Sequence, residues 1–466
     1  STYCTPPSCV GRGYWTAEHR SSHYAARMPV VDYRDAPEDV KEAAVAKCRE
    51  ELAEWLHPKW NTKWNILRWL QDHDYNVDET IDILRKHLKY RRERFLDEDM
   101  RGLQRSIVCE DCHPITVVGS NRREKGDRLL VFEQPGKVDI NGLLMSVQPT
   151  QFLHHMFRGV EMGMRHLNEM EEERGEQCYF HYIFDMGGLK MDPSYIKLCT
   201  GPFRVSWELV GFQYREFIDK FIVLNAPTFL NLFLAALYPF VPAKYRDQFH
   251  KRVVICGRNY KEYLLSIADA ECIPEKYGGT MPDVDVVRSP CPVPKSYYWK
   301  PPPGYPKPEQ LHKVTIPPGK TRAIDFKLEP WTTLGIFSTN DSDVQFWLYY
   351  AADRNDLNID GVTELVLPTA TLTAVPAMDF FDYVAERGGY YQIRMKNTST
   401  WFKNAHIRIR LYDQNKIEIP IINCNEKWIK MATEKPTDIR LEDWAMDNPN
   451  NPLNQKKSRE DFAKKG

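Results

Sequence analysis

One place in the sequence has cysteine and histidine side chains at a spacing that binds metals or haem. Cys109, Cys112 and His113 form a Cys-x-x-Cys-His pattern, which is typical of covalent haem attachment and also occurs as half of a zinc site or as a redox pair. No second cysteine pair with metal-binding spacing accompanies it. His154 and His155 are adjacent, so on a helix they point in different directions and do not favour a shared metal. We expect no metal and no cofactor.

Motifs that position catalytic groups are absent from the sequence. It contains no Gly-x-Ser-x-Gly elbow, no phosphate-binding P-loop and no His-Glu-x-x-His pair. The pair Gly187-Gly188 is interpreted as a turn that follows a strand. We therefore predict no catalytic residues, and we predict that the protein is not an enzyme.

Composition narrows the class of protein further. Of 466 residues, 42% are hydrophobic and 27% are charged, which is typical of a globular chain with two or three domains. The net charge of −1 provides no basic field for nucleic acid, so we expect no nucleic-acid partner. Eleven cysteines, an odd number, suit a reducing compartment, and the N-terminal residues lack the apolar core of a secretory signal. We expect a cytoplasmic protein.

The segment Thr228 to Val241, TFLNLFLAALYPFV, is apolar on every helical face. As a helix it would be about 20 Å long, shorter than the roughly 30 Å hydrocarbon layer of a membrane. It is thus not predicted to span a bilayer. Two interpretations remain: a buried core helix, or a helix that covers something apolar that is not protein.

The pattern of the sequence predicts several structural units that would position the residues named above. Helical spacing begins at Pro37, and after Asp127 short apolar strands alternate with helices, which predicts a mainly parallel sheet. Eight prolines between Ser289 and Pro308 predict an extended linker. Seven strand candidates follow, which predict an antiparallel β-sandwich: 314–316, 321–326, 333–337, 344–350, 363–367, 390–395 and 406–412.

The sequence divides into six parts at these changes of pattern. They are an irregular arm (1–36), an N-terminal helical unit (37–105), an α/β domain (106–288), a proline-rich linker (289–308), a β-sandwich (309–415) and a polar tail (416–466). Trp428 and Trp444 are expected to bring the tail back onto the sandwich.

Several motifs occur in an order and spacing that resembles a known family. LRWL followed by YNV (67–77) is similar to the signature LRFLRARKFDV, and DRLLVFEQPG (127–136), FDMGGL (184–189), KFIVLNAP (220–227) and EKYGGTM (275–281) follow in order. The set resembles the Sec14-like lipid-transfer family, with a CRAL-TRIO α/β domain. VTIPPGKTRAIDF, DVQFWLYY and GGYYQIRMKNTSTWF are similar to a C-terminal GOLD β-sandwich.

The resemblance implies a pocket that holds one hydrophobic ligand under a mobile gate helix, and Thr228 to Val241 occupies the gate position. We expect the ligand to be exchanged at membranes, where an apolar gate can enter the bilayer surface. The pocket is expected to be lined by nine apolar side chains, which any α/β core would also contain: Phe212, Tyr214, Phe217, Ile222, Leu224, Phe229, Leu232, Phe233 and Leu237.

The family's phosphoinositide-binding positions are only partly present. Glu216 keeps the glutamate of a Tyr-Pro-Glu run, and Lys251 and Arg252 fit the basic position, so these three are headgroup candidates; Glu216 and Arg252 could equally form an ordinary ion pair. The basic N-terminal stretch is replaced by Asp72-His73-Asp74, which disfavours a phosphate. Phospholipids, tocopherol-like molecules, retinoids and squalene-like hydrocarbons remain open as ligands.

Two functions follow as hypotheses. The first is a lipid-binding transfer protein, cytoplasmic and transiently associated with membranes such as the Golgi, whose GOLD domain recognises a membrane or a protein partner. The alternative is a trafficking adaptor that binds a protein partner through the GOLD domain and has a vestigial lipid domain.

Overall fold

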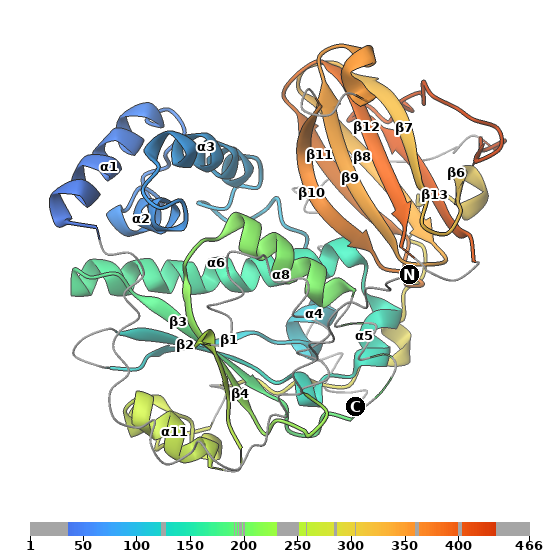
Figure 1. Cartoon of the computed structure of the whole chain (residues 1–466). Coiled ribbons are helices and arrows are strands. Elements are labelled where there is room, and N and C mark those ends of the chain that lie inside the picture. Colours follow the sequence, from blue (N-terminus) through green and yellow to red (C-terminus); the bar gives the residue numbers. More distant parts are fainter. Residues whose placement is uncertain are drawn as a thin grey trace, which may run out of the picture.

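The computed structural model describes residues 36–122, 127–190, 192, 194, 198, 201–230, 251–257, 259–283, 287–302, 304–358, 363–398 and 403–434. Three units are visible in Figure 1: a small helical unit, a sheet flanked by helices, and a β-sandwich. Their order along the chain is the predicted one.

The N-terminal unit consists of α1 (Glu38–Glu51), α2 (Lys63–Asp72) and α3 (Val77–Glu93). The side chain of Thr62 accepts a hydrogen bond from Asn65 N, and that of Asn76 accepts one from Glu79 N, so both helices begin at a capped residue. The buried stripes of the three helices, including Cys48, Leu70 and Leu84, form a separate small core. The predicted N-terminal helices are confirmed.

The central sheet has five strands in the order β1-β2-β3-β4-β5. They are β1 (Thr116–Ser120), β2 (Arg128–Glu133), β3 (Tyr179–Asp185), β4 (Ile218–Leu224) and β5 (Val253–Ile255). β1 is antiparallel to β2, and the other neighbours are parallel. The alternation of strands and helices therefore gives the mainly parallel sheet that was predicted.

Helices cover both faces of this sheet. They are α4 (Ile107–Cys112), α5 (Ile140–Ser146), α6 (Pro149–Arg174), α8 (Pro202–Gln213) and α11 (Tyr260–Ile267). Figure 1 shows α6 and α8 on one face and α11 on the other. The crossovers from β2 to β3 and from β3 to β4 run in one direction along the sheet, so right-handed connections place α6 and α8 on the same side.

Side chains of the strands divide between two cores. Phe180, Tyr182 and Phe184 of β3 belong to the core under α6 and α8, whereas Ile183 belongs to the core under α11. α6 crosses β3 closely: a Cβ on Gly163 would lie 2.5 Å from the ring of Phe180. Residue parity along β3 thus decides which core receives each side chain.

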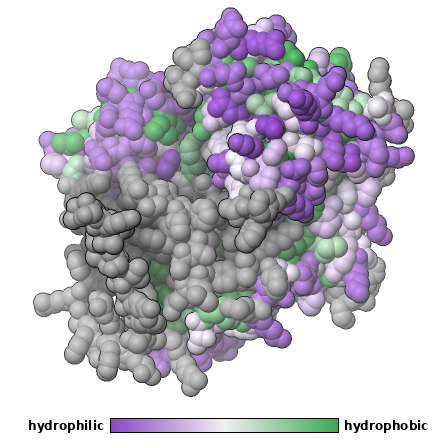
Figure 2. Space-filling model, turned by 45° about the vertical axis from the view of Figure 1, so that its right-hand side comes forward, coloured by the Kyte–Doolittle hydropathy of each residue, from purple (hydrophilic) through white to green (hydrophobic). Residues whose placement is uncertain are grey.

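Only the beginning of the predicted gate helix lies among the described residues. Residues 228–230 follow β4, and Leu230 is buried; 231–250 lie outside the described part of the chain. The described helices include none that is long and apolar enough to cross a membrane. Among the residues that are coloured in Figure 2, hydrophobic ones are scattered between hydrophilic ones.

The C-terminal unit contains two antiparallel sheets, ordered β10-β9-β12-β7 and β11-β8-β13-β6-β14. Its strands are β6 (His312–Ile316), β7 (Thr321–Leu328), β8 (Thr332–Asn340), β9 (Val344–Ala351), β10 (Glu364–Leu372), β11 (Asp379–Ala385), β12 (Gly389–Asn397), β13 (Ala405–Tyr412) and β14 (Ile429–Lys430). Both sheets contribute to one apolar core, so they pack face to face. All seven predicted strands are present.

Two strands of this unit were not predicted. β11 pairs with β8 and faces the α/β domain, and β14 pairs with β6. Trp428 O accepts a hydrogen bond from Thr315 N at 2.7 Å, so the tail returns to the sandwich at Trp428 as expected. Trp444 lies outside the described residues.

The sandwich contacts the α/β domain through β11. Asp379 accepts hydrogen bonds from Thr150 N (3.1 Å) and Thr150 Oγ1 (2.8 Å) in the first turn of α6. The guanidinium of Arg94, which follows α3, lies 2.7 Å from Asp382 Oδ1. Asp379 and Arg94 are buried, so these contacts fix the sandwich against two helices.

We predict that Asp379→Ala destabilises the protein, because it leaves Thr150 N and Thr150 Oγ1 buried without an acceptor. The expected loss is about 1–3 kcal/mol of unfolding free energy, measured by urea unfolding. Asp379→Asn keeps an acceptor oxygen and should lose clearly less. Equal losses for both variants would contradict the assigned role of Asp379.

Candidate ligand-binding site

Five aromatic side chains form a continuous surface between the sheet and α8. Tyr182 and Phe184 come from β3, Phe221 from β4, and Phe203 and Trp207 from α8; we call this set the aromatic wall. Ring centroids are 4.9 Å apart for Tyr182–Phe184, 5.1 Å for Tyr182–Trp207 and 5.6 Å for Trp207–Phe221. Tyr182 and Phe184 are buried and Phe203, Trp207 and Phe221 are half-buried, so the wall is an apolar layer with polar atoms only at Tyr182 and Trp207.

Local sequence explains why these rings meet. Tyr182 and Phe184 are two residues apart on a strand, and Phe203 and Trp207 are four apart on a helix, so each pair shares one face of its element. Pro202 at the first position of α8 fixes where the helix begins. Nε1 of Trp207 is buried and has no hydrogen-bond partner among the described residues.

A buried polar cluster borders the wall. Tyr182 Oη donates a hydrogen bond to Oε1 of Glu133, the last residue of β2, and Nε2 of His113 lies 3.6 Å from Glu133 Oε2. We call these three residues the Glu133 cluster. The side chains of Glu133 and His113 are 1% and 4% exposed, so the cluster is shielded from water.

Burial sets the protonation of the Glu133 cluster. It raises the pKa of Glu133 to about 7, although the hydrogen bond from Tyr182 acts in the opposite direction. Burial also lowers the pKa of His113 to about 3, with a further contribution from the charge of His155. At neutral pH the imidazole is therefore uncharged, and Glu133 is present in both its protonated and its ionised form.

Two atoms of the cluster have unused hydrogen-bonding capacity. Glu133 Oε2 and His113 Nδ1 are buried and have no hydrogen-bond partner among the described residues. Because buried polar atoms are usually paired, an additional group such as a ligand or a water would be stabilised there. The wall and the cluster together can hold a molecule that is mostly apolar and has one polar end.

The predicted pocket residues fall into separate places. Tyr214 and Phe217 are buried in the same core as the aromatic wall, with ring centroids 6.1 Å apart, and Tyr214 Oη donates to Glu161 of α6. Phe229 is partly buried directly after β4. Leu232, Phe233 and Leu237 lie outside the described residues.

Two of the predicted pocket residues are buried on the other side of the sheet, and a third is exposed. Ile222 and Leu224 are fully buried in the opposite core, under α11. They alternate along β4 with Phe221 and Val223, which point to the core of the aromatic wall. Phe212 is 41% exposed near the end of α8. Ile222 and Leu224 therefore lie across the sheet from Phe217, whereas the ring of Phe212 lies at the surface of α8.

Two of the three headgroup candidates, Glu216 and Arg252, pair with each other. Nη2 of Arg252 lies 2.6 Å from Glu216 Oε2, and its Nη1 donates to Ile218 O at 3.0 Å. Both side chains are mostly buried, at 16% and 11% exposure, whereas Lys251 is exposed. The ion-pair interpretation of Glu216 and Arg252 is thus the one that the structure supports.

Two departures from the family motifs compensate each other. Asp72, which stands in the normally basic stretch, is buried, and its Oδ2 lies 3.5 Å from Nη1 of Arg215. Arg215 occupies the position of the proline in the Tyr-Pro-Glu run. A carboxylate and a guanidinium therefore meet where the family has phosphate-binding residues and a proline.

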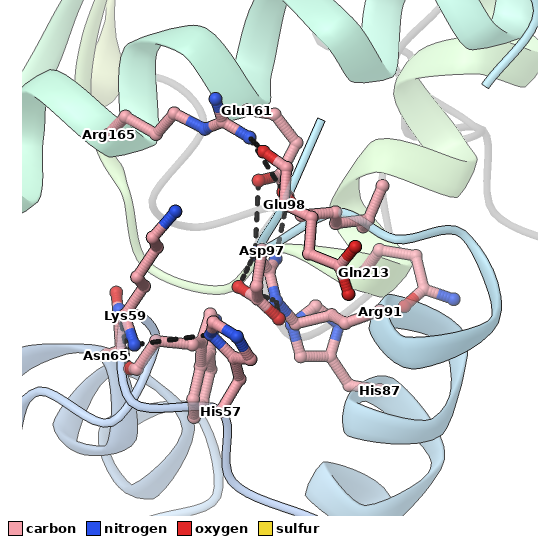
Figure 3. A network of polar contacts seen from close by, with 12 residues as sticks. His57, Lys59, Asn65, His87, Arg91, Asp97, Glu98, Glu161, Arg165 and Gln213 are labelled. Atoms are coloured by element: carbon pink, nitrogen blue, oxygen red, sulfur yellow. Dashed lines mark hydrogen bonds and ion pairs between the residues drawn. The ribbon is translucent and has the colours of Figure 1, made fainter. Parts of the chain in front are cut away.

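A cavity of about 690 Å³ lies between the N-terminal unit and α6. In Figure 3, Arg91 of α3 reaches both Asp97 (2.7 Å) and Glu161 of α6 (2.6 Å), and His87 contacts Gln213 (2.9 Å). Its lining mixes charged residues with aromatic and apolar ones such as Trp60, Trp69 and Met164, so it differs in composition from the aromatic wall.

The Cys-x-x-Cys-His motif is part of the fold. Cys109 and Cys112 are fully buried in α4, and burial raises the pKa of both thiols. His154 Nδ1 accepts from Gln104 N, whereas His155 contacts His113 O, so the two histidines point apart as expected. The described residues contain no group of three metal-ligating side chains.

Sequence reasoning missed the aromatic wall and Glu133. A signal existed in the alternation of Phe180, Tyr182 and Phe184 and in the four-residue spacing of Phe203 and Trp207. Glu133 differs, because a glutamate at a strand end gives no indication of burial. Its partner His113 was noticed only as part of a metal motif.

Comparison with known proteins gives two family matches. A family model described as "CRAL/TRIO domain" matches residues 116–279, and one described as "F28H7_8_C-like, C-terminal domain" matches residues 297–420. The second description does not name a GOLD domain.

Two curated relatives come from Caenorhabditis elegans. "CRAL-TRIO domain-containing protein F28H7.8" is 44% identical over 397 residues, covering 84% of this chain and 95% of the relative. "Protein ctg-1" is 24% identical over 362 residues, covering 74% of this chain and 90% of the relative. Among solved structures, the crystal structure of Sfh5 matches with a TM-score of 0.38 and 14% identity, covering 49% of this chain and 85% of that chain.

We predict that Glu133→Gln changes the pH dependence of stability. The pKa of Glu133 is about 7 in the folded protein and about 4.3 in an unfolded chain. The folded state thus binds the Glu133 proton more tightly than the unfolded state does. The stabilisation that this proton contributes is fully present below about pH 4 and is lost as the pH rises through 7. Between pH 5 and pH 8, the free energy of unfolding of the variant should therefore rise by roughly 2–3 kcal/mol relative to that of the wild type.

Urea unfolding at several pH values measures this difference. Glu172→Gln, at an exposed position on α6, is the control and should follow the wild type. If Glu133→Gln also follows the wild type across this pH range, Glu133 does not carry the raised pKa.

Proposed function

The chain belongs to the CRAL-TRIO family, whose members bind lipids and other hydrophobic ligands, and on that premise we propose that it carries one such ligand against the aromatic wall. The observation that supports this most is the Glu133 cluster. Buried polar atoms without protein partners stand beside five aromatic rings, which suits a molecule with a long apolar body and one polar end.

The segment from Thr228 to Val241 is proposed to cover this ligand. It connects β4 to β5, which are parallel neighbours, and the crossover continues the direction of the previous two. Right-handed connections would bring it to the side of the sheet where α6, α8 and the aromatic wall lie. An apolar segment there would be stabilised by contact with a ligand and, when displaced, by a membrane surface.

The polar end of the ligand is proposed to be uncharged, such as a hydroxyl or carbonyl group. The contacts of Glu133 among the described residues are Tyr182 and His113, and neither supplies a positive charge at neutral pH. A phosphate beside Glu133 would place like charges in a medium of low dielectric. The ion pairs Arg252–Glu216 and Arg215–Asp72 also reduce the charge available to a phosphate.

Exchange at membranes and recognition by the C-terminal unit complete the proposal. The protein would act in the cytoplasm and meet membranes transiently, and the sandwich would serve as a GOLD-type module for a membrane or protein partner. Trp331, in the β7–β8 turn, is 67% exposed, and tryptophan is favoured both at bilayer interfaces and in protein interfaces.

We predict that the full chain, isolated from cells, contains a co-purified lipid detectable by native mass spectrometry. After delipidation it should take up a pyrene-labelled fatty alcohol from vesicles in preference to pyrene-labelled phosphatidylcholine, followed by energy transfer from tryptophan. A protein that takes up neither probe and carries no lipid would contradict the proposal. Preference for phosphatidylcholine would contradict an uncharged polar end.

A matched pair of variants on α8 locates the site. Phe203→Ala removes one ring of the wall and should weaken uptake of the fatty alcohol about tenfold, equivalent to about 1.4 kcal/mol. Phe212→Ala removes an exposed ring from the same helix and should leave uptake unchanged. Reversed results for the two variants would place the ligand elsewhere.

A further inference from the structure

Two cysteines that are far apart in sequence lie in contact at the edge of the core that contains the aromatic wall. The sulfur atoms of Cys112, the last residue of α4, and Cys291, in the proline-rich linker, are 3.5 Å apart. Cys112 is fully buried, whereas Cys291 is partly exposed. A soluble oxidant can therefore reach one member of the pair from outside.

The backbone already holds these two segments together. Cys291 N donates to Asp111 O at 3.2 Å, and Asp111 pairs with Arg288. Val293 N donates to Asp139 Oδ2 at 3.1 Å. The linker is thus hydrogen-bonded to residues on both sides of the cysteine pair, so Cys112 and Cys291 are held close to each other by the fold.

We propose that Cys112 and Cys291 are a modification site, at which a reversible disulfide joins α4 to the linker. A disulfide requires sulfur atoms about 2 Å apart. Rotation of the partly exposed Cys291 side chain can close most of the difference. The bond would close a loop between residues separated by 179 positions in the sequence.

Oxidised glutathione, or another small disulfide, supplies the oxidising equivalents. The thiolate of Cys291 attacks one glutathione sulfur, which breaks the glutathione S–S bond and releases one glutathione thiolate. The thiolate of Cys112 then attacks the sulfur of Cys291, forms the protein disulfide and releases the second glutathione thiolate. The two protein thiols lose two protons and two electrons, and two glutathione thiols are formed.

Burial raises the pKa of Cys112, which lowers the fraction of thiolate available for the second step. The bond would form over time under oxidising conditions and would be reversed by excess reduced glutathione.

The disulfide would act on the region next to the ligand. Cys112 precedes His113 of the Glu133 cluster, and Val293 of the linker is buried in the same core as the aromatic wall. Oxidation would pin the linker against this core and is expected to slow release of the pyrene-labelled fatty alcohol. This consequence, unlike the bond itself, rests on the proposed function.

The test incubates the full chain with oxidised glutathione, alkylates the remaining thiols and maps peptides by mass spectrometry. Cleavage before Asp111 separates Cys109 from Cys112. We expect a peptide that joins Cys112 to Cys291, and a thiol count that falls by two from eleven. Dithiothreitol should restore both thiols.

Two variants serve as tests of specificity. Cys291→Ser should abolish the cross-linked peptide, whereas Cys109→Ser, on the same helix, should retain it. A cross-link to Cys109, glutathione retained on Cys291, or no modification would each overturn the proposal. Because the cross-link is measured without lipid, its absence leaves the proposed function standing, and absent lipid uptake leaves the disulfide standing.

Discussion

Strand β3 must bury both of its faces, and this constraint organises the α/β domain. Its residues from Phe180 to Asp185 are all buried, so every second side chain enters a different core. One parity presents Phe180, Tyr182 and Phe184 to α6 and α8, and the other presents Ile183 and Asp185 toward α11 and Tyr277. The aromatic wall therefore exists on one side of the sheet only, and a ligand bound there is separated from the opposite core by the sheet itself.

Helix α6 holds the three units of the protein in one arrangement. Glu171 pairs with Arg68 of α2, and Glu161 pairs with Arg91 of α3, with all four side chains almost fully buried. At its other end, Thr150 is bound by Asp379 of the sandwich. Figure 1 shows α6 running along the sheet between these partners. Breaking a buried ion pair typically leaves an uncompensated charge in the interior, so each junction resists separation.

The sequence predicted the elements well because hydrophobic period and capping are local properties. The N-terminal helices, the parallel strands and seven of the sandwich strands follow from such patterns. β11 was missed although five of its seven residues are hydrophobic, and the roles of Asp379 and Asp382 in it depend on Thr150 and Arg94, which are distant in the sequence. The pairing of Asp72 with Arg215 likewise joins residues that no local pattern relates.

The candidate site was only partly predictable for the same reason. Of the predicted pocket residues, Tyr214 and Phe217 lie in the core that contains the aromatic wall, whereas Ile222 and Leu224 point to the other core because of their parity on β4. Choosing the correct parity requires knowing which face the crossover helices cover. Glu133 could not have been selected, because its burial and its contact with Tyr182 depend on the pairing of β2 with β3.

The central claim is that the ligand lies on the Tyr182 face of the sheet, with its polar end at Glu133. The most direct measurement is photo-crosslinking with a long-chain alcohol that carries a diazirine beside its hydroxyl group, followed by peptide mapping of the labelled protein. This account predicts labelling of Glu133, Tyr182 or Trp207. Labelling of Ile222, Leu224 or Tyr277 on the opposite face, or of exposed surface residues alone, would contradict it.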